Sequence, residues 1–162
     1  MQNPPPISDL LGELNAFRDY AALVLADNRR DWFYRPAEAD WSLTEIACHL
    51  RDVEREVHQS RVRALLLEEG AFLPGVDADQ WAIPRNYRNQ VGRVALAGFL
   101  AARDETIGLL SPLPSEIWAR QGQHTFFGPT SLQELVYLAV QHDRLHARQI
   151  EKLHQASSGE IE

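Results

Sequence analysis

The chain has 162 residues, which is the usual length of one domain and is long enough to bury a hydrophobic core. Hydrophobic residues make up 44% of the chain and charged residues 24%, as in an ordinary globular protein. The formal net charge of −7 argues against broad binding to nucleic acid or to an anionic membrane surface, although Arg29, Arg30 and Arg35 cluster.

Cysteine content and hydropathy indicate a cytoplasmic protein. The single cysteine, Cys48, cannot form an internal disulfide. The sequence does not open with a basic stretch followed by an apolar run, so no signal peptide is predicted. No apolar run approaches the roughly 20 residues that a membrane helix needs.

Residues 1–7 hold three prolines and are predicted to be a flexible lead-in. Ser8 or Asp9 then caps a first helix, which fades near Asn28. The apolar positions of this helix recur every three or four residues and are Leu10, Leu14, Phe17, Ala21 and Val24. The stretch 31–41 contains Pro36 and is predicted to be a loop that packs its aromatic side chains on the rest of the protein.

Ser42 and Glu45 form a capping box at the start of a second helix, which runs to about Glu69 and stops at Gly70. Its apolar stripe is Leu43, Ile46, Leu50, Val53 and Val57. A long connection over 70–88 follows, with one short helical turn expected around 79–82.

A third helix is predicted over 89–110, with Val94, Phe99, Ile107 and Leu110 on its apolar face. Pro112 and Pro114 end it and begin a second long connection, 111–130. Ser131 and Glu134 repeat the capping box, and the last helix runs from there to about Gln155.

These four helices, without convincing strand alternation, predict an all-α protein. We expect a single four-helix bundle domain over 8–156 and a frayed tail at 157–162. The two long connections allow a crossover topology in place of a simple up-and-down one.

The last helix carries the strongest functional signal. Its core-facing stripe is Leu132, Leu135, Ala139, His142, His146, Gln149 and Leu153. His142 and His146 are four residues apart, so both imidazoles lie on one face, about one turn from each other, as ligands of a single metal ion would. The same pair is also explained by two core histidines bonded to polar groups of the bundle, or by a pH-sensitive pair.

His49 on the second helix is the third candidate ligand. It lies about 60° from the centre of the apolar stripe, a border position that can look inward. If the second and last helices are antiparallel, a rise of about 1.5 Å per residue places the three rings at similar heights.

The motif WSLTEIACHLRDVE (41–54) followed by HDRLH (142–146) resembles the DinB-like family of small metal-binding bundles, also called YfiT-like. The resemblance covers essentially the whole chain after the proline lead-in. It implies a four-helix bundle with a crossed connection, frequent homodimers, and metal ligands at His49, His142 and His146. The implied ion is nickel or zinc, with manganese or iron as alternatives, because imidazole suits several divalent metals.

Other residues are weaker candidates. Glu45, Asp143 and Gln149 are predicted acceptors for the outer ring nitrogens. Cys48 is expected to pack in the core, and His58, nine residues beyond His49, is expected on the opposite, exposed side. His124 is in the loop before the last helix and is not expected at the site.

Three functions compete. The resemblance implies a metal-dependent enzyme acting on small molecules, using a low-molecular-weight thiol for S-transfer or isomerisation, or else catalysing hydrolysis. The alternatives are a non-catalytic metal- or ligand-binding bundle linked to stress responses, and an interaction protein whose site has decayed. An open cavity over the three histidines would favour the enzyme, and a sealed site would favour a structural metal. The catalytic residues and the substrate are not predicted.

Overall fold

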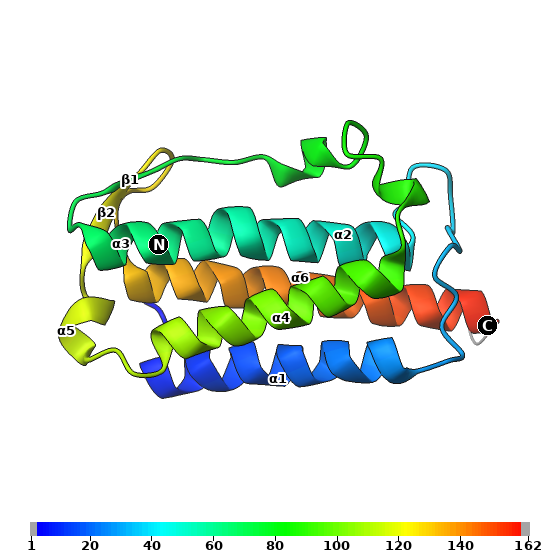
Figure 1. Cartoon of the computed structure of the whole chain (residues 1–162), viewed down its shortest axis with the longest axis horizontal. Helices are drawn as coiled ribbons and strands as arrows, with labels where there is room; N and C mark the ends of the chain where they lie inside the picture. Colours follow the sequence, from blue (N-terminus) through cyan, green and yellow to red (C-terminus); the bar gives the residue numbers. More distant parts are fainter. Residues whose placement is uncertain (1–2, 160–162) are drawn as a thin grey trace.

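The computed structural model describes residues 3–159, so parts of the predicted lead-in (1–2) and tail (160–162) lie outside the described residues. Four long helical stretches dominate the molecule (Figure 1). They are α1 (Ile7–Ala26), the continuous stretch formed by α2 (Leu43–Val53), η1 (Glu54–His58) and α3 (Gln59–Leu67), then α4 (Gly92–Leu110) and α6 (Leu132–Ser158). None of the described helices is long and apolar enough to cross a membrane.

The bundle has a crossed connection. Figure 1 shows α1 and α6 running in one direction and α2, α3 and α4 in the other. The segment between α3 and α4 returns along the outside of the bundle, so that two consecutive long helices are parallel. It contains the short turns η2 (Ala78–Trp81) and η3 (Tyr87–Asn89). The four-helix bundle and its crossover are therefore confirmed, as is the short turn expected around 79–82.

Three short strands form a small sheet at one end of the bundle. β1 (Phe72–Leu73) pairs in parallel with β2 (Gln121–His124), and β2 pairs antiparallel with β3 (Gly128–Ser131), while α5 (Ser115–Trp118) precedes β2. These strands were not predicted from the sequence, because two to four residues are too few for an alternating pattern to show. A Cβ at position 122 would lie 2.6 Å from Leu73 Cδ1, so Gly122 allows β1 and β2 to approach.

Helix boundaries differ from the predictions where backbone groups take the place of side-chain caps. The carbonyl of Pro6 accepts hydrogen bonds from the Asp9 and Leu10 amides, so α1 begins at Ile7 and neither Ser8 nor Asp9 is its cap. Both predicted capping boxes are present, at Ser42–Glu45 and Ser131–Glu134. The last helix continues to Ser158, beyond the predicted end at Gln155, and Gly159 ends it in the left-handed conformation.

The third long helix begins at Gly92, three residues later than predicted, and its predicted apolar face is confirmed in part: Phe99 and Leu110 are buried and Ile107 is partly buried. Val94 is instead 67% exposed, whereas Ala95 and Leu96, which were not predicted, are buried. The buried stripe also includes Arg103 and Thr106. A search for large apolar side chains alone therefore misses the buried arginine and threonine of this helix.

Two hydrophobic clusters fill the bundle, one towards each end. The first includes Phe17, Leu50, Phe99 and Ile150, and the second includes Leu14, Val62, Leu110 and Val140. In each long helix the change from one cluster to the other falls near the middle. A buried charged group lies at that level.

Arg103 on α4 is the centre of this charged group. Its guanidinium donates to both carboxylate oxygens of Glu54, at 3.0 and 2.9 Å, and to both of Asp143, at 2.7 and 2.9 Å. All three residues are at most 3% exposed. Burial raises the pKa of Asp143 to about 6 despite the bonds from Arg103, because two carboxylates share one guanidinium away from water.

Replacing Arg103 by methionine should destabilise the protein strongly, because it leaves two buried carboxylates without their cation. We expect the free energy of unfolding, measured with urea at pH 7, to fall by about 3–5 kcal/mol. The matched control is Arg144→Met, which breaks an exposed pair with Glu13 on the same bundle and should change stability by less than about 1 kcal/mol. Equal effects of the two substitutions would contradict the assigned role of Arg103.

Candidate metal centre

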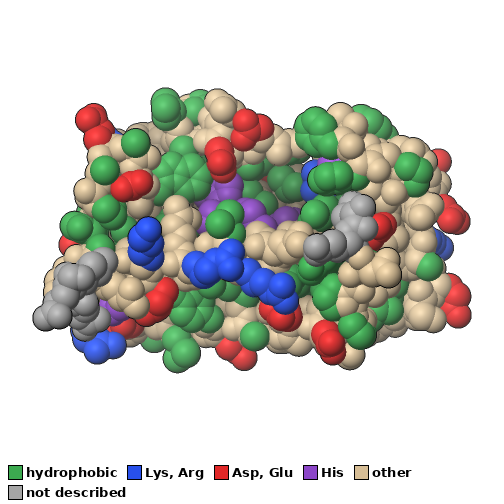
Figure 2. Space-filling view, turned by 180° about the vertical axis from the view of Figure 1, so that it is seen from behind, with side chains coloured by type: hydrophobic (Ala, Val, Ile, Leu, Met, Phe, Trp, Pro, Cys, Tyr) green, Lys and Arg blue, Asp and Glu red, His purple; other side chains and the backbone are tan. Residues whose placement is uncertain are grey.

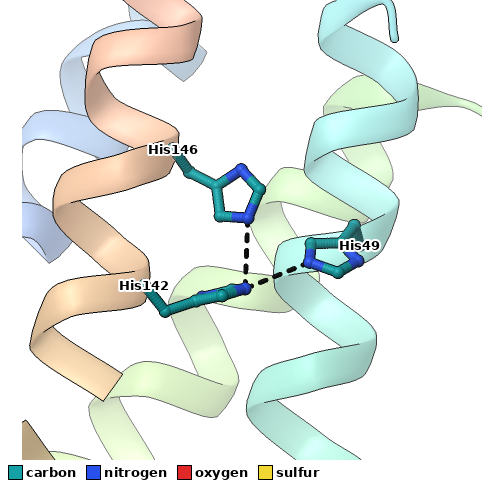
Figure 3. Close-up of side chains that lie close together, drawn as sticks. All are labelled: His49, His142 and His146. Carbon is teal, nitrogen blue, oxygen red and sulfur yellow. Dashed lines mark hydrogen bonds between the residues drawn. The ribbon is translucent and has the colours of Figure 1, made fainter. Parts of the chain in front are cut away.

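His49, His142 and His146 lie together between α2 and α6. The Nε2 atom of His142 is 3.0 Å from Nε2 of His49 and 3.1 Å from Nε2 of His146 (Figure 3). Their potential ligand atoms all lie within 4.8 Å of one another. Because α2 and α6 are antiparallel, the three rings lie at the same level along the bundle. The rise per residue of the two helices predicted this arrangement.

The helix starts position these rings. The Ser42 side chain accepts a hydrogen bond from the Glu45 amide, and the Glu45 carboxylate accepts one from the Ser42 amide. His49 follows seven residues later, two turns into α2. The equivalent box at Ser131 and Glu134 fixes the start of α6, which carries the other two histidines.

The three imidazoles are largely removed from water. His49 is 2% exposed, His146 is 5% exposed and His142 is half-buried. Burial is the main cause that lowers the pKa of His49 to about 3 and the pKa of His142 further still, and repulsion from neighbouring histidines is the second cause. Burial also lowers the pKa of His146. All three rings are therefore neutral at pH 7, which is the state that binds a metal ion.

The hydrogen bonds fix the tautomer of His146. Its Nδ1 is 2.8 Å from Oε1 of Gln149, an oxygen that can only accept, so Nδ1 carries the hydrogen and Nε2 carries the lone pair. His142 Nε2 has at most one hydrogen to share between two facing Nε2 atoms. At most one of the two contacts can thus be a well-aligned hydrogen bond. The other leaves two ring nitrogens facing each other without one, which a cation bound to the nitrogens would relieve.

The nitrogen spacing also fits a metal ion. Bonds of about 2.0–2.1 Å from one zinc ion would separate adjacent ligand nitrogens by roughly 3.0–3.4 Å, close to the 3.0 and 3.1 Å found here. The cluster could therefore hold a metal ion on its Nε2 atoms.

Of the three predicted acceptors for the outer nitrogens, Gln149 alone is in place. The Glu45 carboxylate is held in the capping box and beside Arg35, and Asp143 is bonded to Arg103, so both of those predictions were wrong. Within residues 3–159, the Nδ1 atoms of His49 and His142 are buried without a partner. Gln149 thus orients one ring, while packing orients the other two.

His58 was expected on the opposite side from His49, but its ring lies 5.5 Å from that of His142, centroid to centroid. The cause is the π-helical segment η1, in which the Gln59 amide bonds to the carbonyl of Glu54, five residues earlier. In a regular α-helix, nine residues at about 100° each would place His58 about 180° around the axis from His49. A π-helical turn accommodates one extra residue, so the rotation is about 100° smaller and His58 lies about 80° from His49. Burial lowers the pKa of His58 to about 4, so this ring is neutral as well.

A cavity of about 890 Å³ opens over the histidines. Figure 2 shows histidine side chains at the floor of a hollow on this face of the molecule. The Trp41 ring contacts His49 at a centroid distance of 5.0 Å, and Asp79 Oδ1 lies 3.9 Å from His49 Nε2.

His124 on β2 also lines the cavity, which corrects the expectation that it lies away from the site. No sequence signal places His124 there, because the strand that carries it was not predicted.

The predicted core role of Cys48 is confirmed. Its side chain is fully buried, and its sulfur lies 3.5 Å from the side-chain oxygen of Gln90. Burial raises the pKa of its thiol to about 11. Cys48 is therefore neither a ligand of the histidine cluster nor a thiolate nucleophile at neutral pH.

Comparison with known proteins identifies the family. A model of the DinB superfamily matches residues 17–150. The chain belongs to the DinB superfamily. It is similar in fold to the solved structure of YfiT from Bacillus subtilis, which is described as a probable metal-dependent hydrolase with an unusual four-helix bundle topology. The two are 20% identical with a TM-score of 0.73, and the match covers 93% of this chain and 85% of that one. Comparison with curated proteins gives no match.

The resemblance inferred from the two motifs is thus confirmed for this DinB-superfamily chain. Both motifs contribute to the histidine cluster, one through α2 and the other through α6. The YfiT comparison supports the crossed bundle, since at 20% identity it speaks to the fold alone.

The hydrogen bonds predict different tautomers for two histidines. In metal-free protein at pH 7, His146 should carry its hydrogen on Nδ1, whereas His124 should carry it on Nε2 because its Nδ1 accepts from the Phe126 amide. Two-bond proton–nitrogen NMR spectra distinguish these forms. Gln149→Leu should remove the preference of His146 and leave His124 unchanged. An Nε2-protonated or charged His146 in the unsubstituted protein would contradict this geometry.

Proposed function

We propose that His49, His142 and His146 bind one divalent metal ion and that the chain is a metal-dependent enzyme acting on small molecules. The observation that carries the proposal is the convergence of three neutral and largely buried imidazoles at the floor of an open cavity. Three protein ligands leave coordination positions for water or substrate, as in catalytic sites. A sealed cluster would instead favour a structural metal.

The bound ion would supply Lewis acidity, which acidifies water or a thiol or polarises a carbonyl. The chain's own residues would bind and orient. Gln149 holds the His146 ring, Trp41 packs against His49, and the depressed imidazole pKa values keep the ligands free of protons. We propose nickel or zinc, with manganese or iron as alternatives, because a three-imidazole site accepts each of them.

The attacking group is proposed to come from a small molecule. The one cysteine of the sequence is buried against Tyr87 and Gln90 and is not a nucleophile. A low-molecular-weight thiol, acidified at the site, is the proposed co-substrate of an S-transfer or isomerisation reaction. Hydrolysis by an acidified water is the second candidate, favoured by the description of YfiT as a probable metal-dependent hydrolase. Homodimer formation stays a prediction from the family resemblance.

The first test is metal content, measured by inductively coupled plasma mass spectrometry on untagged protein. We expect about one equivalent of a divalent metal, lost in His142→Ala. His154→Ala is the matched control, because His154 is on the same helix but outside the cluster. The ion found would then be used in parallel thiol-transfer and ester-hydrolysis assays. Protein that contains no metal and takes none up would refute the proposal.

The pKa shifts predict the number of protons released on metal binding. Because the folded protein already holds the three rings neutral, zinc binding at pH 6 should release fewer than about one proton. Histidines with the ordinary pKa of about 6.5 would be mostly charged at pH 6 and would together release about two. Calorimetry in two buffers of different ionisation enthalpy measures this number. A release of two protons would show that burial does not lower these pKa values.

A further inference from the structure

Arg61 on α3 lines the histidine cavity one turn beyond His58. It is half-buried, and its Nη2 donates to the carbonyl of Pro74 at 3.1 Å. Within residues 3–159 no carboxylate forms an ion pair with it. Asp77, three residues beyond Pro74, accepts a hydrogen bond from the side chain of Gln80.

Two other half-buried arginines, Arg93 and Arg120, likewise bond only to backbone carbonyls, but neither lines this cavity. Some arginines elsewhere in the bundle have acidic partners. Arg103 is bonded to two carboxylates, and Arg35 lies 3.3 Å from Glu45. Arg61 lacks such compensation, and burial accordingly lowers its pKa, whereas paired Arg103 has its pKa raised. A guanidinium that is partly desolvated and unpaired is destabilised unless an anion joins it.

Asp40, Asp77 and Asp79 also line the cavity, but within residues 3–159 none of them forms an ion pair with Arg61. The positive charge of Arg61 helps to lower the pKa of both His58 and His124, which line the same cavity and are neutral at pH 7. Apolar side chains, among them Val53, Val57 and Leu138, line the same cavity as Arg61 and the three histidines. The cavity therefore combines a metal-binding cluster, an apolar wall and an unpaired cation.

We propose that Arg61 forms an anion-binding subsite of this cavity and that the substrate is an amphipathic organic acid. Its carboxylate would bind the guanidinium, its hydrocarbon part would contact the apolar wall, and its other end would reach the histidine cluster. The planar fork of donors on arginine matches the two oxygens of a carboxylate. This inference rests on the proposed metal function, because the histidine cluster defines the reacting end of the substrate.

The test compares two ligands that differ in one group, 6-mercaptohexanoate and 6-mercaptohexanol. Both are titrated into the full chain loaded with cobalt(II), whose absorbance reports thiolate binding. We expect the acid to bind at least roughly tenfold more tightly than the alcohol, as a charge-assisted bond would allow. In Arg61→Gln the preference should fall to within about threefold, with binding of the alcohol unchanged.

Two further variants control this experiment. Arg148→Gln removes an exposed cation from the same cavity and should preserve the preference, because solvent screens that charge. Arg61→Lys retains the charge without the fork and should keep a smaller preference for the acid. Arg61→Lys also replaces Arg61→Gln as the test variant if Arg61→Gln does not fold or does not bind cobalt. A preference that survives in Arg61→Gln, or that depends on Arg148, would overturn the proposal.

A metal-free arm separates this inference from the metal function. Hexanoate and hexanol are titrated into protein without metal while the Nε–H NMR signal of Arg61 is followed. A shift caused by hexanoate alone supports the subsite even if cobalt does not bind, in which case the metal proposal fails by itself. If cobalt binds and neither readout distinguishes acid from alcohol, the metal proposal stands and the Arg61 subsite is refuted.

Discussion

Arg103 lies at mid-length of the bundle, where its guanidinium bonds to Glu54 on the α2–α3 stretch and to Asp143 on α6. Because the guanidinium also bonds to the carbonyl of Leu14 on α1, all four long helices meet at one buried cation, with hydrophobic clusters towards either end. A buried pair of this kind contributes little net stability compared with apolar packing, but it allows few alternative arrangements. We interpret it as the contact that sets how the α2–α3 stretch and α6 slide along each other.

That register has direct consequences for the histidines. Asp143 follows His142 in the sequence, and Glu54 is the first residue of the π-helical segment that ends at His58. Fixing Glu54 and Asp143 to the same guanidinium therefore fixes the relative heights of the histidines on the two helices. The carboxylates lie in the core, while the imidazoles face the cavity on the other side of the same helices. The bundle keeps its buried acidic groups apart from the candidate metal ligands, which are all neutral.

The sequence predicted those parts of the site that depend on local rules. Capping boxes fixed the starts of α2 and α6, and the four-residue spacing placed His142 and His146 on one face. His58 escaped prediction because a single extra residue in a helical turn rotates all that follows, and no residue pattern in 54–58 announces it. His124 escaped because its strand is short and is paired through contacts distant in sequence. Arg103 escaped because a buried arginine looks like a surface residue until its partners are known.

The donor set of the histidine cluster bears on the kind of substrate that the cavity would accept. Carboxylate ligands neutralise part of the charge of a divalent metal ion, whereas three neutral imidazoles neutralise none of it. The three ligands would leave the charge of a bound metal ion unchanged, although Asp79 Oδ1 lies 3.9 Å from His49 Nε2, and the cavity wall also carries Arg61 without an ion pair. Under these proposals the site would bind anions at two places, a thiolate or hydroxide at the metal and a carboxylate at Arg61. The acidic surface of the chain, with its formal net charge of −7, is no obstacle, because screening confines the effect of exposed charges to about 8–10 Å. Local charge in the cavity, not the net charge of the chain, therefore determines which small molecules bind.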